Sequence, residues 1–507
     1  MSSYNPWVVY SLLFTGACGF IQWGFFLSVS GSALKYFQNV SFEGISDGRL
    51  SLIASMLTIG AAFGAFIGGP LATRIGRRLT LLIGDFIMLV GIALTLVEKY
   101  GCIITGRLIE GVIVGLNTTV VPLYILEMVP IQVRGKAGVL NSTLLTGGLV
   151  FAYGMGFTVP TDGEESQNWR INFALPAIFS ILRIFILIFV YTGDTPFYNV
   201  INNREEKAMI MLKRIYRTNP EQVLEGLKKD KEFAEQSKKG EVRLRDLFTQ
   251  NYRKLFAVGF VLAIIQQLCG TAAVFTFTQF IFEYGLDDPA NSKLPQTFSL
   301  IVSLFNLAFV FISYFSIDRF GRKMHLVVNL FILALINFAY AVIGSVDSPG
   351  NLAAKIILLI WPIFFSLSVG ALCFLYLGET LPDIGMAVVV LCNWTSSFIE
   401  TQWFLDVANA IGLDGVFYIF GGLTLAATIF LGFFMIESKG KTKAEIIAEY
   451  AGTKGKVVAA EFAGNEATKQ SDKSSKIMPE SFQVLVSSDV TQQIDAGTTF
   501  VEEKSQL

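Results

Sequence analysis

The stretch GRLIEGVIVGLNTTVVPLYILEMVPIQVRG, residues 106–135, decides the fold class of this 507-residue chain. It begins as an apolar helix with Arg107 near its start, and Glu127 stands near its far end. Charges at the margins of an apolar span are costly unless they meet a partner or an interface. Gly111 and Gly115 form a small-xxx-small face, which lets a neighbouring helix approach closely in lipid. A soluble core helix has little use for either feature, so the stretch predicts a membrane protein.

The composition supports this prediction and excludes several other classes of protein. Hydrophobic residues make up 53% of the chain and charged residues only 16%, whereas soluble domains carry about 25% charged residues. The net charge of −1, without a basic stripe, argues against a nucleic-acid partner. The five cysteines are scattered within apolar runs and His325 is the single histidine, so we expect no disulfide framework and no metal site. No nucleophile–base pair or phosphate loop supports an enzyme, and we expect no cofactor.

The apolar runs predict an all-α membrane protein with twelve transmembrane helices in two pseudo-symmetric six-helix bundles. A span needs about 20 mostly apolar residues. The first run is long enough to remain in the bilayer, so we expect no cleavable signal peptide. The twelve segments that satisfy this length are 7–29, 50–72, 79–97, 101–125, 137–157, 172–192, 254–284, 296–317, 325–346, 352–377, 387–411 and 415–436.

Two polar segments divide the chain into four regions. The segment between the sixth and seventh spans has helical periodicity in Arg204–Tyr216 and Pro220–Ser237, and the polar C-terminal segment has the composition of a largely disordered tail. The predicted regions are an N-terminal six-helix bundle, a linker with short helices, a C-terminal six-helix bundle and a tail, at 1–192, 193–253, 254–436 and 437–507.

The distribution of Lys and Arg predicts the orientation in the membrane. Short loops rich in these residues lie on the cytoplasmic side. Arginine and lysine follow the second, fourth and eighth spans, so both termini and the linker are expected in the cytoplasm, with the plasma membrane as the default location. The sequon Asn39-Val40-Ser41 falls in the first outer loop, which makes Asn39 a candidate N-glycan site.

The two halves of the chain repeat the same motifs. Arg74-Ile-Gly-Arg-Arg78 matches Arg319-Phe-Gly-Arg-Lys323, and Glu127-x-x-Pro130 matches Glu379-x-x-Pro382. Membrane topology alone explains the charge of each loop separately, but it does not explain their recurrence at matching positions. A duplicated bundle is what a carrier needs when its two halves rock about a central site.

Several motifs in order resemble the sugar porter family of the major facilitator superfamily, over nearly all of residues 7–446. The motifs that carry the resemblance are Gly106-Arg107-x-x-x-Gly111-x-x-x-Gly115, Pro122-x-Tyr124-x-x-Glu127-x-x-Pro130-x-x-x-Arg134-Gly135, Trp169-Arg170, Gln266-Gln267-Leu-x-Gly270, Asp318-Arg319-x-Gly321-Arg322-Lys323, Asn393-Trp394 and Glu437-Ser-Lys439-Gly440.

The resemblance implies a cytoplasmic network of ion pairs that closes and breaks as the halves rock. Partly desolvated pairs at helix ends can bias a two-state equilibrium. The residues that the resemblance assigns to this network are Arg77, Arg107, Glu127, Arg134, Asp318, Arg322, Glu379 and Glu437.

The resemblance also implies a sugar site formed by Gln266, Gln267, Asn306 and Asn393, with Ser142 and Phe374 as further lining residues. Carboxamides offer both a donor and an acceptor to a pair of sugar hydroxyls. The alternative for these side chains is that they bind neighbouring helices to one another, as polar residues in lipid commonly do.

The chain departs from the family pattern at several positions of the site. Ser142 stands where glutamine is usual, Ala272 replaces an asparagine, Thr276 and Phe277 replace paired tyrosines, and Phe374 replaces a tryptophan. Each missing hydrogen bond to a buried hydroxyl costs about 1–3 kcal/mol, so we expect altered sugar affinity or preference.

The first span indicates how transport is driven. In proton-coupled relatives it carries an aspartate, but residues 22–26 (QWGFF) contain no carboxylate. This favours facilitated diffusion of a monosaccharide, which we expect to be a hexose, by alternating access. The alternatives are a proton symporter that uses Glu110 or Glu400, and a sugar sensor that signals through its tail.

Arg183, inside the sixth span, is expected to pair with Asp85 or Glu110, because a bare charge there is costly.

Overall fold

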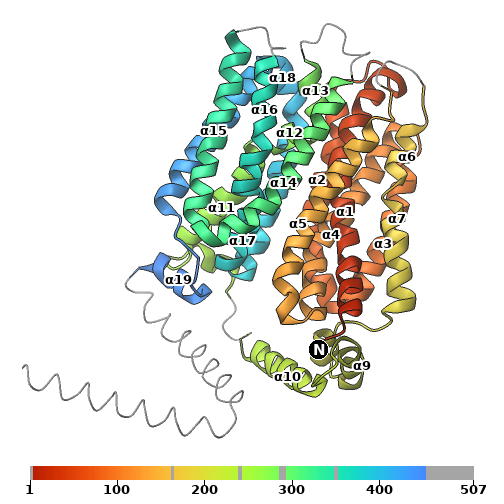
Figure 1. Ribbon diagram of the computed structural model, residues 1–507, viewed down its shortest axis with the longest axis vertical. Coiled ribbons are helices and arrows are strands. Elements are labelled where there is room, and N and C mark those ends of the chain that lie inside the picture. The colour runs from red at the N-terminus through yellow and green to blue at the C-terminus, as the bar shows by residue number, and fades with distance from the viewer. Residues whose placement is uncertain (1–3, 161–164, 238–241, 285–292, 347–351, 453–507) are drawn as a thin grey trace, which may run out of the picture.

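Two helical bundles lie side by side in the computed structural model, which describes residues 4–160, 165–237, 242–284, 293–346 and 352–452 (Figure 1). The N-terminal bundle is coloured red to yellow. Its helices are α1 (Pro6–Tyr36), α2 (Asp47–Ile75), α3 (Arg77–Thr95), α4 (Tyr100–Met128), α5 (Ile131–Gly156), and α6 (Asn168–Ala174) with α7 (Ala177–Phe185).

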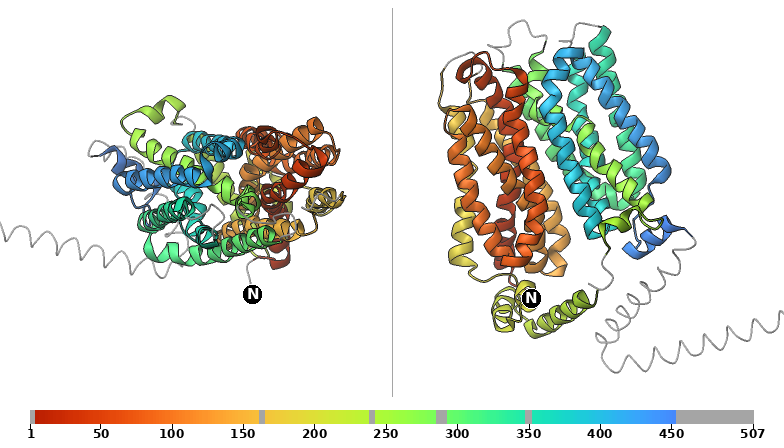
Figure 2. Two further views of the ribbon diagram at one scale, coloured as in Figure 1. Left: turned by 90° about the horizontal axis from the view of Figure 1, so that it is seen from above. Right: turned by 180° about the vertical axis from the view of Figure 1, so that it is seen from behind.

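The C-terminal bundle, coloured green to blue, repeats this arrangement with more interruptions (Figure 2). Its helices are α11 (Arg253–Leu268), α12 (Thr271–Thr276), α13 (Thr278–Glu283), α14 (Leu294–Phe320), α15 (Arg322–Val346), α16 (Leu352–Phe365), the π-helical turn η5 (Ser366–Gly370), α17 (Ala371–Thr380) and α18 (Asp383–Phe434).

The helices of the described chain account for twelve spans, as the sequence predicts. Ten of them are long and apolar enough to cross a membrane. One of the ten, α18, has 52 residues and holds two spans, because Gly412 (φ 82°, ψ 159°) interrupts the helix where the eleventh span ends. The remaining span is α5, with 26 residues. The predicted all-α fold with two six-helix bundles is confirmed.

Short helices gather at one end of the bundles, which we call the linker end; the opposite end is the far end. The linker helices α8 (Pro196–Ile201), α9 (Glu205–Ile215) and α10 (Pro220–Ser237) lie there beside the N-terminus (Figure 1). The backbone N–H of Asn5 donates to the carbonyl of Ile215 over 2.9 Å. Helices α9 and α10 coincide with the two periodic segments expected in the linker.

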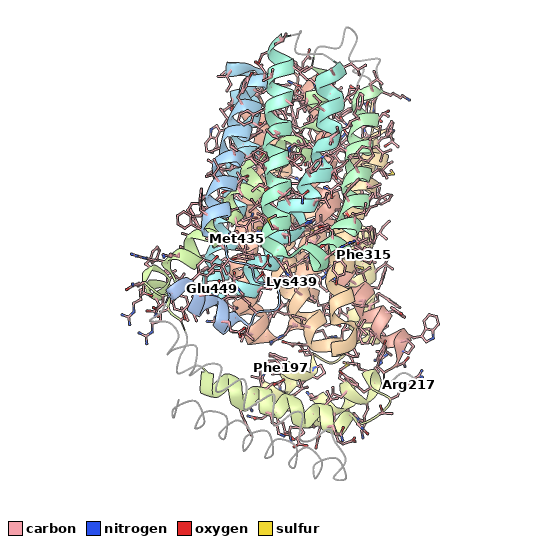
Figure 3. The ribbon with its side chains drawn as sticks, turned by 60° about the vertical axis from the view of Figure 1, so that its left-hand side comes forward. Phe197, Arg217, Phe315, Met435, Lys439 and Glu449 are labelled. Carbon is pink, nitrogen blue, oxygen red and sulfur yellow. The ribbon has the colours of Figure 1, made fainter. Side chains whose placement is uncertain are left out.

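The start of the predicted tail is folded. Helix α19 (Lys443–Ala451) begins with a capping box of Thr442 and Glu445, and its Tyr450 hydroxyl lies 2.8 Å from the Tyr376 hydroxyl of α17. Lys439 and Glu449 lie at the linker end, as do Phe197 and Arg217 (Figure 3). Residues 437–452, the first part of the predicted tail, are therefore ordered, and residues 453–507 lie outside the described part of the chain, so the prediction of a largely disordered tail stays a prediction.

The small-residue face predicted on α4 packs directly against α2. A Cβ atom on Gly111 or Gly115 would collide with the backbone carbonyl of Leu57 or Ala61. Gly60 and Gly64 of α2 have the same relation to the backbone of α4. The two helices thus touch backbone to backbone, which is the close packing that small residues permit in lipid.

Candidate functional site

Three carboxamides meet at the end of α11, and we call Gln266, Gln267 and Asn393 the carboxamide cluster. The Asn393 side chain on α18 donates to Gln266 Oε1 over 2.6 Å and to the carbonyl of Ala263 over 2.7 Å. Gln267 Nε2 donates to Gln266 Oε1 over 2.8 Å and to Asn393 Oδ1 over 3.2 Å. All three residues are buried. The structure brings together three of the four predicted sugar-binding amides.

The carboxamide cluster keeps hydrogen-bonding capacity for a ligand. Gln266 Nε2 and Gln267 Oε1 have no hydrogen bond to the described residues. One is a donor and the other an acceptor, which is the combination that a sugar hydroxyl pair requires. The cluster binds α11 to α18, which is the alternative role considered for these amides, and it still presents two polar atoms, while its contact with a sugar stays a prediction.

Two tryptophans connect the bundles, and one of them, Trp394, directly follows Asn393 of the carboxamide cluster. The rings of Trp23 on α1 and Trp394 on α18 lie 5.5 Å apart between centroids. Trp23 Nε1 is buried and has no hydrogen-bond partner among the described residues. Aromatic side chains together with a few polar groups are typical of a small-molecule site. Sequence reasoning missed Trp23, whose only signal is its place in the first span.

The other predicted sugar-site residues do not join the carboxamide cluster by any hydrogen bond in the described chain. Asn306 is buried on α14, and its backbone carbonyl accepts from Ser366 over 3.4 Å. Ser142 is exposed on α5, and Phe374 is half-buried on α17 against the central core. Their contact with a sugar stays a prediction.

The seventh span is broken directly after the carboxamide cluster, at Gly270 (φ 107°), and we call this the α11–α12 break. Side chains from two other helices satisfy the backbone on either side of it. Asn337 of α15 donates to the carbonyl of Cys269 over 3.1 Å, and Trp361 Nε1 donates to Asn337 Oδ1 over 3.0 Å. The backbone N–H of Ala273 donates to the carboxyl of Glu400 over 3.1 Å.

Polar contacts join the two bundles in the far-end half of the molecule. Lys35 of α1 and Glu283 of α13 form an ion pair of 2.5 Å, and Lys35 also lies 4.3 Å from the centre of the Phe280 ring. The Tyr153 hydroxyl of α5 donates to the carbonyl of Phe275 in α12. Further bonds join α2 to α18, namely Ser55–Gln402 at 2.6 Å and Asp47–Asn409 at 2.7 Å. These contacts hold the two bundles together in the far-end half.

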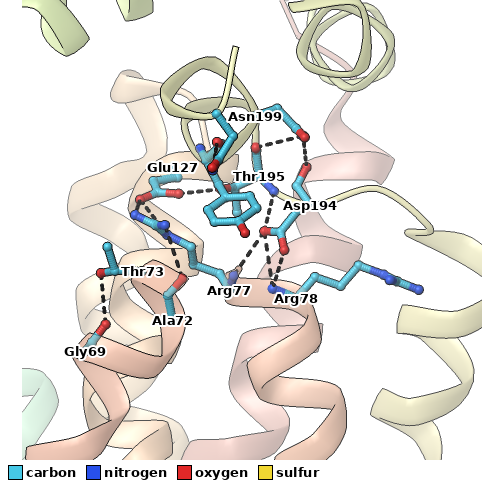
Figure 4. A network of polar contacts seen from close by, with 11 residues as sticks. Gly69, Ala72, Thr73, Arg77, Arg78, Glu127, Asp194, Thr195 and Asn199 are labelled. Carbon is cyan, nitrogen blue, oxygen red and sulfur yellow. Dashed lines mark hydrogen bonds and ion pairs between the residues drawn. The ribbon is translucent and has the colours of Figure 1, made fainter. Parts of the chain in front are cut away.

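At the linker end, charged side chains hold the N-terminal bundle together (Figure 4). Arg77 and Glu127 form an ion pair of 2.7 Å, and the Thr195 hydroxyl donates to Glu127. The Asp194 carboxylate accepts from the backbone N–H groups of Arg77 and Arg78 over 3.1 and 3.3 Å, which satisfies the first turn of α3. Burial raises the pKa of Asp194 above its usual value, although the backbone donors oppose this.

The C-terminal bundle repeats this arrangement. Arg322 and Glu379 form an ion pair of 3.1 Å, and Ser438 donates to Glu379 over 2.6 Å. Glu437 accepts from the backbone N–H groups of Arg322 and Lys323 over 2.8 and 2.9 Å. Burial acts to raise the pKa of Glu437, but these donors outweigh it and the pKa lies below its usual value. The duplication read from the sequence thus extends to individual hydrogen bonds.

The predicted ion-pair network needs one correction. Arg107 lies in the far-end half of α4, about 30 Å from Glu127 at 1.5 Å per residue. It pairs with Glu110 at 2.9 Å and donates to Ser30 and to the carbonyl of Phe26, each over 2.8 Å. The assignment of Arg107 to the cytoplasmic network was therefore wrong. The side chains of Arg134 and Asp318 lie outside the described part of the structure, so their place in the network stays a prediction.

The structure also shows which partners the charged side chains inside the spans contact. Arg183 forms a bidentate ion pair with Asp85, with N–O distances of 2.7 and 2.6 Å, and it also donates to the side-chain oxygen of Asn117 over 3.1 Å. Asp85 is thus its partner, rather than Glu110. Glu110 has both oxygens engaged, by Arg107 and by Thr95 at 2.8 Å. Glu400 differs, because its Oε2 is buried without a partner among the described residues.

The sequence of this chain matches a known protein family and several of its members. The family model described as "Sugar (and other) transporter" matches residues 13–450. Hexose transporter 1 of Plasmodium vivax (strain Brazil I) is 29% identical over 415 residues, which cover 77% of this chain and 81% of the relative. Facilitated trehalose transporter Tret1 of Polypedilum vanderplanki is 28% identical and covers 87% and 88%. Myo-inositol transporter 1 of Saccharomyces cerevisiae is 26% identical and covers 88% and 79%.

Solved structures share the fold. The xylose transporter XylE from E. coli, in a partially occluded inward open conformation, superposes with a TM-score of 0.72 at 21% identity, over 86% of this chain and 99% of the other. XylE in its inward open conformation gives the same TM-score. At this identity the likeness establishes the two-bundle fold alone.

Proposed function

The chain belongs to the sugar (and other) transporter family, and we propose that it carries a monosaccharide across a membrane by facilitated diffusion. The observation that supports this most directly is the carboxamide cluster, with a free donor and a free acceptor beside the paired tryptophans Trp23 and Trp394. We expect the sugar to be a hexose. The relatives named above are called transporters of hexose, trehalose and myo-inositol, which are all polyhydroxylated molecules.

The places where the bundles are joined support a mechanism of alternating access. The carboxamide cluster lies on the C-terminal bundle and Trp23 on the N-terminal bundle, so a sugar between them contacts both halves. In this state the ion pair of Lys35 and Glu283 helps to hold the far ends together. Transport requires this contact to break while the linker ends close. The ion pairs Arg77–Glu127 and Arg322–Glu379 each lie within one bundle and would keep each half rigid as it rocks.

The orientation that we propose places the linker end in the cytoplasm. Basic residues of the short loops, such as Arg77 and Arg322, lie at that end, as the positive-inside rule requires. Asn39 is exposed at the far end, where an N-glycan could be attached in the plasma membrane. The closed far end then faces outward, and the carrier is in an inward-facing state.

A proton symporter is the second candidate. The observation that favours it is the unpartnered Oε2 atom of Glu400, because a coupled carrier needs a titratable group within the span region. Glu110 is the weaker choice for this role, since its two oxygens are bound to Arg107 and Thr95.

Uptake of labelled glucose, fructose and other small sugars into liposomes that contain the purified protein tests both candidates. The assay is run with and without an inward proton gradient. Facilitated diffusion predicts uptake that stops at equal concentrations and ignores the gradient. Accumulation that requires the gradient would replace this proposal with symport, and an absence of uptake by folded protein would favour a sensor or another solute.

A further inference from the structure

Glu400 contacts the start of α12, which has no side-chain cap of its own. Helix α12 begins after Gly270, which has no side chain to offer to the first N–H groups of the helix. Glu400 Oε1 accepts from the N–H of Ala273 instead. On the other side of the α11–α12 break, Asn337 binds the carbonyl of Cys269. The break is therefore held between a carboxyl group of α18 and an amide of α15.

Within the described residues, the second oxygen of Glu400 is buried without a hydrogen-bond partner and forms no ion pair with a cationic side chain. The Cys269 thiol approaches from α11, whereas α15 presents Asn337 and Tyr340 near this depth. Helix α2 presents Ser55 and Thr58, while its charged Asp47 and Arg49 stand at the far end.

This setting differs from that of the other acidic groups within the spans. Asp85 and Glu110 each pair with an arginine, but Glu400 has no such partner among the described residues. An ionised carboxylate enclosed without a counter-charge is strongly disfavoured, whereas an unpartnered neutral hydroxyl costs far less.

The helices that Glu400 contacts also carry the far-end contacts. Phe275 of α12 accepts from Tyr153, and Glu283 of α13 pairs with Lys35. Phe277, between the two helices, stacks on Phe404 of α18 at 4.9 Å. The contact between Glu400 and the start of α12 therefore helps to hold α12 and α13, which carry the far-end contacts, against α18.

We propose that Glu400, as the neutral acid, holds α12 and α13 against α18 and so closes the far end, and that its ionised form releases them. Opening would expose Glu400 to the far-side solution, so the proton leaves and returns on one side of the membrane. This role rests on the proposed carrier function and adds a pH response to it, but it moves no net proton. Glu400 is thus a positioning residue for the far-end closure.

The test measures the far-end distance directly in the full-length protein in lipid nanodiscs, without sugar. Spin labels are attached at Glu43→Cys and Val346→Cys, which are exposed far-end positions on the two bundles, in a background in which the native cysteines are replaced by serine. The proposal predicts that the long-distance population rises with pH, by up to about tenfold per pH unit, the limit for release of one proton. Glu400→Gln keeps an acceptor for Ala273 and should stay in the short-distance population at every pH.

Asp414→Asn is the matched control, since Asp414 also lies on α18 but bonds to Ser345 of α15. It should keep the pH response of the parent protein. Equal pH responses in the parent and in Glu400→Gln would overturn the proposal, as would a parent distance that does not change with pH. Because no sugar is present, this result is independent of whether the chain transports sugar, and the liposome assay tests that function separately.

Discussion

Asp194 and Glu437 occupy equivalent places in the two bundles, and each carboxylate accepts backbone N–H groups at the start of a helix, α3 for Asp194 and α15 for Glu437. Their environments nevertheless shift the two pKa values in opposite directions. Burial dominates at Asp194 and raises its pKa, whereas the donors at Glu437 outweigh burial and lower its pKa. The two halves are therefore related in geometry but not in their response to pH.

Glu437→Gln should destabilise the folded protein at neutral pH by about 1 kcal/mol, in the range expected for a charge at a helix N-terminus. A depressed pKa contributes stability that is fully present above the ordinary glutamate value, about 4.3, and is lost as the pH falls through the lower folded-state value. The Tm difference between the parent and Glu437→Gln should therefore shrink at more acidic pH, below about 4. Thermal unfolding of the purified protein across a pH series measures it.

Asp194→Asn should behave differently at the same pH values. A raised pKa means that the folded state binds the proton more tightly than the unfolded state, so ionised Asp194 adds no stability at neutral pH through its titration. Asparagine retains an acceptor for the N–H groups of Arg77 and Arg78, and we expect a smaller loss of Tm than in Glu437→Gln. A larger loss would show that the charge of Asp194 matters more than its geometry.

Arg183→Leu should destabilise the N-terminal bundle by about 3–5 kcal/mol, because it leaves Asp85 buried without its partner. Asp85→Leu combined with Arg183→Leu should recover much of this loss, since the double variant buries no charge. Yield of monodisperse protein and Tm measure both effects. If Arg183→Leu alone folds and transports like the parent, the pair has no structural role.

Asn393→Ala should weaken sugar binding by about 1–3 kcal/mol, which corresponds to a roughly 5- to 150-fold rise in Kd. The substitution removes a partner of Gln266 and disturbs the carboxamide cluster. Gln250→Ala is a suitable control, because it also removes a carboxamide but lies exposed after η4 (Leu244–Phe248), away from the cluster. Equal sugar affinity of both variants, measured by binding to folded protein, would remove Asn393 from the site.

Gly115→Ala should destabilise the protein, by about 1–3 kcal/mol, because its new methyl group meets the backbone of Ala61 and pushes α2 away from α4. Gly101→Ala is the matched control on the same helix, since a Cβ atom there meets nothing within 4 Å. It should leave Tm unchanged or raise it slightly. Similar Tm values for both variants would contradict the backbone contact between α2 and α4.

Much of this protein was predictable from local patterns in its sequence. The length of the apolar runs indicated twelve spans, because a bilayer has a fixed thickness. The spacing of Gly111 and Gly115 indicated a close helix contact, and the recurring Arg-Gly-Arg loops indicated the duplication. The amides Gln266, Gln267 and Asn393 stood out because polar side chains in lipid need partners.

The partner of each polar side chain, by contrast, was decided only by the tertiary structure. Arg107 was assigned to the wrong end of the molecule, since a motif does not state the depth of its residues in the membrane. The choice of Asp85 for Arg183, the approach of Trp23 to Trp394 and the free oxygen of Glu400 depend on how helices far apart in the sequence are rotated and staggered. Hydrophobic length and residue spacing are properties of single segments, whereas partner choice is a property of contacts between segments.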